Sequence, residues 1–428
     1  MDAQYSWHPD ASSDENPLAI RVGDFIFSGG QMAIHPIEGF PKSVQPTPGY
    51  PWHGSPMERQ LRYIYNNLSK TLEELGSSLR HIMKINSFHL NPLEIDMALR
   101  VRPEFFGDAP PPSTLLLVPE LTARGPSVNL DVVAVASNSS LQREPIYSGF
   151  QGPAQNQIYG QPIFLQAVRG GGLVFTRGKA GATDDRGAVP EVFGHPDFPY
   201  QDNQIRFQTE FALTSLQKVL EDAGISLRDV VKAEVYLGDM RHLASMNDVW
   251  EKFFPNDPPA RLVAPASIAL PDMVVEIELI AVDPNGPYTK EVISTREAPT
   301  PLGPESQAIK AGPFLFLSGQ MATDYVSGVP REARSDPGFP FHSSNIVRQV
   351  EYIYKNVATI CKAAGVDPRN LLRRRALHLD LNDLTEGERV WQAKMDGRPH
   401  PRTILRVDGS LPVPDCSVLY DITGYTSS

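Results

Sequence analysis

An arginine and a glutamate that lie fifteen residues apart, Arg261 and Glu276, are the residues of this sequence with the clearest chemical potential. Each lies in an apolar, β-branched run, and Leu270-Pro271-Asp272 between the two runs is typical of a turn. Two neighbouring antiparallel strands would then place a guanidinium and a carboxylate in one cleft. A guanidinium binds a carboxylate bidentately, and a nearby Glu can orient or deprotonate water. The pair therefore predicts a site that hydrolyses a small carboxylate, and the alternative is an ion pair across two surface strands.

The composition predicts a soluble globular protein. With 428 residues, of which 41% are hydrophobic and 21% charged, the chain is long enough for roughly two to four domains. Its formal charge of −11 is spread along the chain without a basic stripe, so we expect no nucleic-acid partner. We also expect no membrane span and a cytoplasmic location, because no long apolar run and no leader-like start are present. Only Cys361 and Cys416 occur, and no metal or other cofactor is expected.

The chain contains three copies of one pattern. Segments that begin at Ala19, Gln166 and Gln307 each read as a strand, a Gly turn, a second strand and a further Gly. About thirty residues later each copy has a helical pattern, followed by a strand, a second helix and two closing strands. The first helices end at equivalent glycines and carry a glutamine at one fixed offset before them, at Gly76, Gly224 and Gly365 and at Gln60, Gln208 and Gln349.

This order predicts an α+β fold in which helices cover one face of a sheet. A single copy would leave the second face exposed, whereas three copies can bury it around a common axis. We therefore expect three tandem domains, at residues 1–145, 146–290 and 291–428, closed into a pseudo-trimer within one chain. The chain itself is expected to be a monomer or a homodimer.

Several strings resemble the RidA (YjgF/YER057c/UK114) family. They are Phe316-Leu317-Ser318-Gly319-Gln320, Pro259-Ala260-Arg261 and the run of residues 275–282, Val-Glu-Ile-Glu-Leu-Ile-Ala-Val. The resemblance implies chorismate-mutase-like domains that form trimers with a ligand cleft at each interface. It also implies hydrolysis of reactive imines or enamines of 2-amino acids, which yields 2-oxo acids and ammonia.

The resemblance assigns roles to residues of the second copy. Arg261 would bind the substrate carboxylate, Glu276 would orient the water, and Asn247 would line the pocket. The family's Ser-Gly becomes Arg177-Gly178, where Gly178 would present its backbone N–H and Arg177 would crowd the pocket or add a cation.

The other two copies match these positions less completely. The third copy retains the Arg and the Ser-Gly but has Glu388 at the Asn position, and its matching residues are Arg402, Ser318 and Gly319. The first copy retains Ser28-Gly29, has no Arg and has Asn129 near the Glu position. Because only the second copy has Arg, Glu and Asn together, we expect one fully equipped cleft.

Each copy also has an aromatic-Pro-aromatic loop before its first helix. Tyr200 and His342 lie in two of these loops, which could close over the clefts and contact substrate, or could hold one copy against the next.

We expect a cofactor-free hydrolase that acts on the C=N bond of a small carboxylate. One alternative is a ring-opening cyclic-amide hydrolase, in which Ser113 would act with Lys84 or Lys179. The other is a metabolite-binding protein without activity, with Arg402 and Arg261 as anion anchors.

Overall fold

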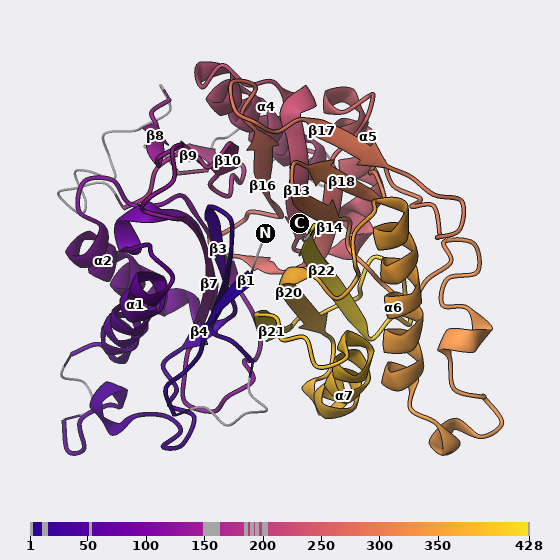
Figure 1. Cartoon of the computed structure of the whole chain (residues 1–428), viewed down its shortest axis with the longest axis horizontal. Coiled ribbons are helices and arrows are strands. Elements are labelled where there is room, and N and C mark those ends of the chain that lie inside the picture. The colour runs from indigo at the N-terminus through magenta and orange to yellow at the C-terminus, as the bar shows by residue number, and fades with distance from the viewer. Residues whose placement is uncertain are drawn as a thin grey trace.

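The structure is a computed structural model that describes residues 3–10, 16–50, 54–148, 163–183, 187–188, 192, 197–198 and 204–426. Three similar units follow one another around a central axis, with strands towards the axis and helices outside (Figure 1). The predicted α+β fold of three tandem domains in a pseudo-trimer is confirmed.

Each unit is one sheet covered by two long helices. The first sheet contains, in spatial order, β1 (Ala3–Ser6), β2 (Ala19–Val22), β3 (Phe25–Ser28), β7 (Val128–Val135), β5 (Ile82–His89) and β6 (Ser113–Leu117). Its helices are α1 (Pro56–Glu74) and α2 (Ile95–Phe106), and the short β4 (Gln31–Met32) pairs with β7.

The second and third sheets repeat this order. The second contains β8 (Glu144–Ile146), β9 (Ala167–Gly170), β10 (Leu173–Thr176), β16 (Val275–Val282), β13 (Val230–Leu237) and β14 (Ala260–Pro265), with helices α4 (Gln204–Asp222) and α5 (Leu243–Phe253). The third contains β17 (Lys290–Ile293), β18 (Ala308–Ala311), β19 (Phe314–Leu317), β22 (Val418–Tyr425), β20 (Leu371–His378) and β21 (Arg402–Arg406), with α6 (Asn345–Ala363) and α7 (Leu384–Met395). The sequence pattern missed the edge strands β1, β8 and β17.

The expected pairing of the two closing strands is wrong. We expected β14 and β16 to be antiparallel neighbours, but β13 lies between them, parallel to β14 and antiparallel to β16. The short β15 (Ser267–Ile268), which follows β14, instead pairs with β6 of the first domain. The segment between the closing strands therefore joins two domains and is not a simple hairpin turn.

The repeated glutamines hold the strands that close each sheet. Gln208 on α4 donates to the carbonyl of Asp272 and accepts from the N–H of Val274, at 3.0 and 2.9 Å, just before β16. Gln349 makes the equivalent pair of hydrogen bonds before β22. Gln60 accepts from the N–H of Ser127 before β7 and donates to the Ser127 hydroxyl. Each glutamine is buried and fixes the start of the strand that carries the Glu position of the resemblance.

The inner faces of the three sheets meet in an apolar layer and a charged layer. In the apolar layer, phenylalanines of all three domains pack together, with the rings of Phe25 and Phe314 edge to face at 5.2 Å. The charged layer, here called the axial cluster, consists of Lys84, Asn86 and Asp131 from the first domain, Lys232, Glu234 and Glu278 from the second, and Arg373, Arg375 and Asp421 from the third. All nine side chains are buried.

Ion pairs in the axial cluster close the ring. Lys84 pairs with Glu278 of the second domain at 2.9 Å, and Lys232 pairs with Asp421 of the third domain at 2.6 Å. Arg373 returns to Asp131 of the first domain at 3.0 Å. Because the cation of each domain meets the carboxylate of the next, the three domains form a closed cycle.

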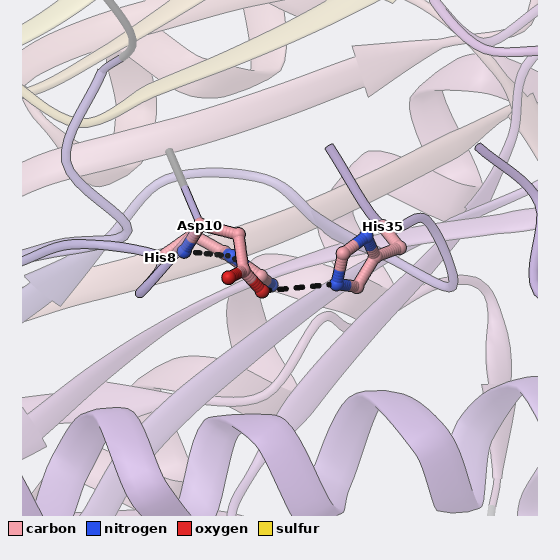
Figure 2. Close-up of side chains that lie close together, drawn as sticks. All are labelled: His8, Asp10 and His35. Carbon is pink, nitrogen blue, oxygen red and sulfur yellow. Dashed lines mark hydrogen bonds and ion pairs between the residues drawn. The ribbon is translucent and has the colours of Figure 1, made fainter. Parts of the chain in front are cut away.

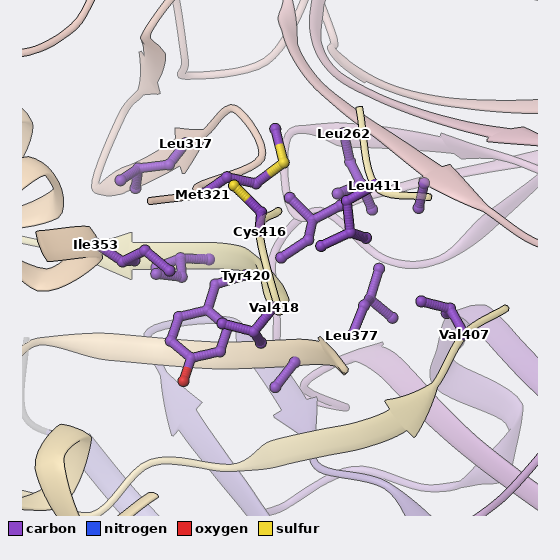
Figure 3. Close-up of a cluster of buried hydrophobic side chains, with 14 of the residues drawn as sticks. Leu262, Leu317, Met321, Ile353, Leu377, Val407, Leu411, Cys416, Val418 and Tyr420 are labelled. Atoms are coloured by element: carbon purple, nitrogen blue, oxygen red, sulfur yellow. The ribbon is translucent and has the colours of Figure 1, made fainter. Parts of the chain in front are cut away.

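The second and third domains share a further apolar seam. Leu262 of β14 faces Leu411 of the third domain, near Met321 and Leu377 (Figure 3).

Among the described residues, no helix has the length and apolar character needed to cross a bilayer.

Candidate functional site

Equivalent backbone hydrogen bonds join neighbouring domains at the three junctions. The N–H of Gly178 donates to the carbonyl of Ser113 at 3.2 Å, and the N–H of Gly319 donates to Arg261 at 2.9 Å. The N–H of Gly30 donates to Arg402, also at 2.9 Å. Each junction therefore combines the Arg position of one domain with the Gly and Glu positions of the next.

These bonds also correct the role expected of the glycines. Because the N–H groups of Gly178 and Gly319 already donate to a neighbouring domain, they are not presented to a ligand. They also show that Gly29-Gly30, and not Ser28-Gly29, is the first domain's equivalent of Ser318-Gly319. Ser318 itself accepts from the N–H of Arg261 at 2.8 Å.

Arg261 and Glu276 line different cavities, so the prediction that they share one cleft is wrong. On β13, Arg261 lies opposite Ala233 and Glu276 lies opposite Tyr236, on the two sides of that strand. Arg261 lines a cavity with the third domain, whereas Glu276 lines one with the first domain. We call these cleft B and cleft A. The expectation failed because it treated each copy as a complete site.

Cleft A, between the first and second domains, has a volume of about 210 Å³. Its polar side chains are Ser113 from the first domain and Arg177, Lys179, Thr183 and Glu276 from the second. Its apolar lining includes Ile95, Leu99, Leu115 and Phe164. Two cations and one carboxylate thus stand on the wall that the second domain supplies.

Glu276 holds its proton more tightly than an ordinary glutamate. Burial and the nearby Glu278 raise the pKa of Glu276 to about 8, although Lys84 and Arg177 act to lower it. A Cβ at position 178 would overlap the Glu276 carboxylate, so Gly178 makes room for this side chain. At neutral pH Glu276 is mostly a neutral acid that can donate a proton.

The cations of cleft A lie against aromatic rings. The guanidinium of Arg177 stacks over Phe164 at 4.4 Å from the ring centroid, and the Lys179 ammonium lies 5.7 Å from that of Phe211. Arg177 stands at the position where the family has Ser, and Ser113 stands where it has Arg. In cleft A the guanidinium therefore lies on the wall of the second domain, whereas the resemblance places it on the wall of the first.

Ser113 is the polar group of the first domain in cleft A. Its side chain is buried, and its hydroxyl makes no hydrogen bond with the described residues. Lys84 does not activate it, because the Lys84 ammonium is bonded to Thr114, to the carbonyl of Thr176 and to Glu278. Of the two lysines expected near Ser113, Lys179 is the one that lines the same cavity.

Cleft B, between the second and third domains, has a volume of about 140 Å³. Arg261 donates from Nη1 to Asn247 and from Nε to Glu305, both at 2.9 Å, and its guanidinium lies over Trp250. Leu419 occupies the Glu position, so the cleft has the Arg and Asn but lacks that carboxylate. The remaining lining is largely apolar, including Leu243, Val263, Leu302, Met321 and Val413.

Glu305 is a site residue that the sequence did not indicate. It comes from the linker before β18, which is fixed to the second domain by hydrogen bonds from Trp250 to the carbonyl of Pro304 and from Ser306 to that of Pro259. A Cβ at Gly303 would overlap the Arg261 guanidinium, so the linker passes close to it. Gly303, two residues before Glu305, was the feature of the sequence that could have indicated this close approach.

The third junction is occupied by charged side chains. Arg402 and Arg374 both bond Glu388, and the amide oxygen of Asn16 accepts from Arg402. Burial alone would raise the pKa of Glu388, but the two arginines lower it to about 2. Arg402 is therefore already paired with a carboxylate of its own domain.

The aromatic loops contribute less than expected. Tyr200 lies outside the described residues. His342 is exposed, 5.7 Å from the ring of Phe339, and lines neither cleft A nor cleft B. That it contacts a ligand therefore stays a prediction, which the lining of the two clefts does not support.

Two histidines and an aspartate gather near the N-terminus, at His8, Asp10 and His35 (Figure 2). His35 Nε2 lies 3.2 Å from the Asp10 carboxylate, and backbone N–H groups of Ile37 and Glu38 donate to its Nδ1. Because a backbone N–H can only donate, Nδ1 is the acceptor and Nε2 carries the proton. This arrangement favours a His–Asp hydrogen bond over a metal site, in which Nε2 would need a free lone pair.

Comparisons with known proteins agree with the threefold repeat. The family model described as Endoribonuclease L-PSP matches residues 8–136, 155–283 and 295–418. A RutC family protein of Sinorhizobium fredii is 40% identical over 101 residues, which are 24% of this chain and 71% of that protein. The mouse protein named 2-iminobutanoate/2-iminopropanoate deaminase is 30% identical over 118 residues, 28% of this chain and 79% of that protein.

The chain is also similar to solved structures. RidA from an Antarctic Psychrobacter species is 25% identical, covers 32% of this chain and 98% of that chain, and has a TM-score of 0.26. The resemblance to the RidA family is confirmed by the family model and by the named relatives.

Proposed function

The chain belongs to the Endoribonuclease L-PSP family, which includes the RidA proteins, and on this premise we propose that it hydrolyses the C=N bond of a small carboxylate-bearing imine in cleft A. An enamine substrate would first tautomerise to the imine. Water adds to the imine carbon, ammonia leaves, and a carbonyl compound remains. One observation carries the proposal: an acid with a pKa of about 8 lines the same small cavity as two cations.

The cations would bind the substrate. Arg177 and Lys179 would attract its carboxylate to the wall of the second domain, and the apolar residues of the first domain would contact its side chain. Arg177 also favours ionised Glu276, so a bound carboxylate that neutralised this cation would favour the protonated acid. Binding would thereby prepare the acid for its task.

Glu276 would transfer protons in both steps. Neutral Glu276 donates its proton to the imine nitrogen, which makes the carbon more electrophilic. The resulting carboxylate accepts a proton from the attacking water, which gives the carbinolamine, and the same proton then goes to the departing amine. As ammonia leaves, the carbinolamine hydroxyl becomes the carbonyl and gives its proton to Glu276, which restores the neutral acid. Imines are already electrophilic, so one acid–base group beside a fixed anion site provides the chemistry required.

Ammonia release from freshly generated 2-imino acids tests this assignment. Arg177→Ala should raise KM by at least about tenfold, because it removes a charge-assisted hydrogen bond worth roughly 1.5–3 kcal/mol. Arg261→Gln, in cleft B, should leave kcat/KM within about threefold of wild type. The reverse result, with loss only in Arg261→Gln, would assign the reaction to cleft B and refute the proposal.

A second candidate function rests on Ser113. A buried hydroxyl without a partner among the described residues, in the same cavity as Lys179, is also what a ring-opening amidase would use for nucleophilic attack. Ring opening of a cyclic amide that is lost in Ser113→Ala, with no imine hydrolysis by wild type, would favour this function. A purely anion-binding role is less well supported, because Arg261 and Arg402 are each paired with a carboxylate of the chain.

A further inference from the structure

Three arginines line one cavity in the third domain, away from the clefts. Arg331, Arg334 and Arg348 surround a space of about 680 Å³ beside the start of α6, together with Ser327, Val329, Ser335, Asp336 and Pro337. No residue of this cavity lines cleft A or cleft B. With three cations and one acid in its lining, the cavity carries a formal charge of +2 on a chain whose net charge is −11.

Two of the guanidiniums are held in place. Arg334 donates from Nε to the carbonyl of Val329 at 2.6 Å, and Arg348 donates from Nε to the hydroxyl of Ser343 at 3.3 Å. Both bonds use Nε. Arg331 is exposed, and its guanidinium makes no hydrogen bond or ion pair with the described residues.

The acids around the cavity have other partners. Asp336 accepts from the N–H of Gly338 at 2.8 Å, and Glu332 accepts from Lys355 at 3.2 Å. Asp415 approaches Arg334 only at 3.6 Å, and both of these side chains are largely exposed. A surface pair of this kind is weak, so Asp415 does not compete strongly with an anion for Arg334.

We propose that this cavity, here called the arginine pocket, binds a small anion with two linked phosphate groups. Guanidiniums bind phosphate oxygens bidentately, so three of them match two phosphates better than they match one. Two phosphate groups carry roughly three to four negative charges near neutral pH, and the three arginines offset most of them. The first turn of α6 carries no acidic residue that would repel such a ligand.

Calorimetric titration of the full chain with sodium pyrophosphate at low ionic strength tests the pocket. Wild type should bind pyrophosphate, and Arg331→Ala should weaken binding by about tenfold, as expected for loss of one charge-assisted contact. Because the Arg331 guanidinium has no partner among the described residues, this variant should fold normally. Arg331→Ala combined with Arg348→Ala should abolish measurable binding, whereas Arg389→Ala, an exposed arginine on α7, should bind as wild type does.

Two further arms make the result decisive. Inorganic phosphate should bind at least about tenfold more weakly than pyrophosphate, and equal affinities would overturn the diphosphate assignment. No binding of pyrophosphate by wild type at about 1 mM, or equal binding by the double variant, would overturn the site itself. Imine hydrolysis should be the same in wild type and the double variant, so failure of this proposal is distinguishable from failure of the proposed function.

Discussion

Replacing Glu276 by Gln should stabilise the folded protein while it abolishes imine hydrolysis. The side chain is 8% exposed, and its pKa is raised from 4.5 to about 8, chiefly by burial and then by Glu278. The folded state therefore binds a proton that the unfolded chain releases above pH 4.5. The stability associated with this proton is fully present below pH 4.5 and is lost progressively as the pH rises to about 8.

The magnitude follows from the pKa difference. Each pH unit between the two pKa values costs wild type about 1.4 kcal/mol, so the loss between pH 5 and pH 8 is about 4 kcal/mol. Gln has the same shape as protonated Glu and does not ionise, so the free energy of unfolding of the variant does not fall in this way as the pH rises. Unfolding of 428 residues has an entropy of about 0.9 kcal/mol/K, and the Tm of the variant should therefore gain about 4 °C on wild type over this range.

Thermal unfolding of both proteins at half-unit pH steps from 5 to 9 measures this difference. Taking the variant minus wild type cancels the contributions of other titrating groups. The Tm difference should grow steadily up to pH 8 and then level off. A difference that stays constant from pH 5 to pH 8 would refute the raised pKa and, with it, the role of Glu276 as a neutral acid.

Three further changes probe other parts of the structure. Arg375→Met removes one of the two cations that the buried Asp131 and Glu234 share, so that of this pair only Arg373 remains, and should cost about 3–5 kcal/mol in thermal unfolding; a Tm within about 1 °C of wild type would contradict this. Glu305→Gln frees Arg261, so calorimetry should detect butanoate binding at least about tenfold tighter than in wild type, and no gain would mean that Glu305 does not compete for that cation. Gly178→Ala displaces Glu276 and should lower kcat by about 100-fold with the circular dichroism spectrum retained, whereas an unchanged kcat would show that the close contact has no role in the reaction.

Local patterns in the sequence predicted the domain fold well. Gly76, Gly224 and Gly365 follow the first helices with φ values of 75°, 74° and 67°, as their predicted role in ending a helix requires. The equivalent glutamines also proved meaningful, because each bonds the segment before a closing strand. These signals act over short distances or through the repeat, and both are visible in a linear sequence.

The composition of the clefts could not be predicted in the same way. Residue spacing within one copy cannot reveal that β13 separates Arg261 from Glu276, or that a cleft combines two copies. Nor could it show that Glu305, in a linker, reaches the guanidinium of Arg261. Such contacts depend on how the domains are placed around an axis. The resemblance implied a ligand cleft at each interface, but it did not say which side chains of two neighbouring domains line that cleft.

The axial cluster implies that the three domains are no longer interchangeable. The first domain contributes one cation and one carboxylate to the cluster, a net formal charge of 0. The second contributes one cation and two carboxylates, a net charge of −1. The third contributes two cations and one carboxylate, a net charge of +1. An assembly of three second domains would bury three uncompensated negative charges, and one of three third domains would bury three positive charges. Covalent linkage guarantees one copy of each in every molecule, which a symmetric homotrimer cannot do. The single polypeptide therefore holds three different domains in a fixed ratio of one to one to one.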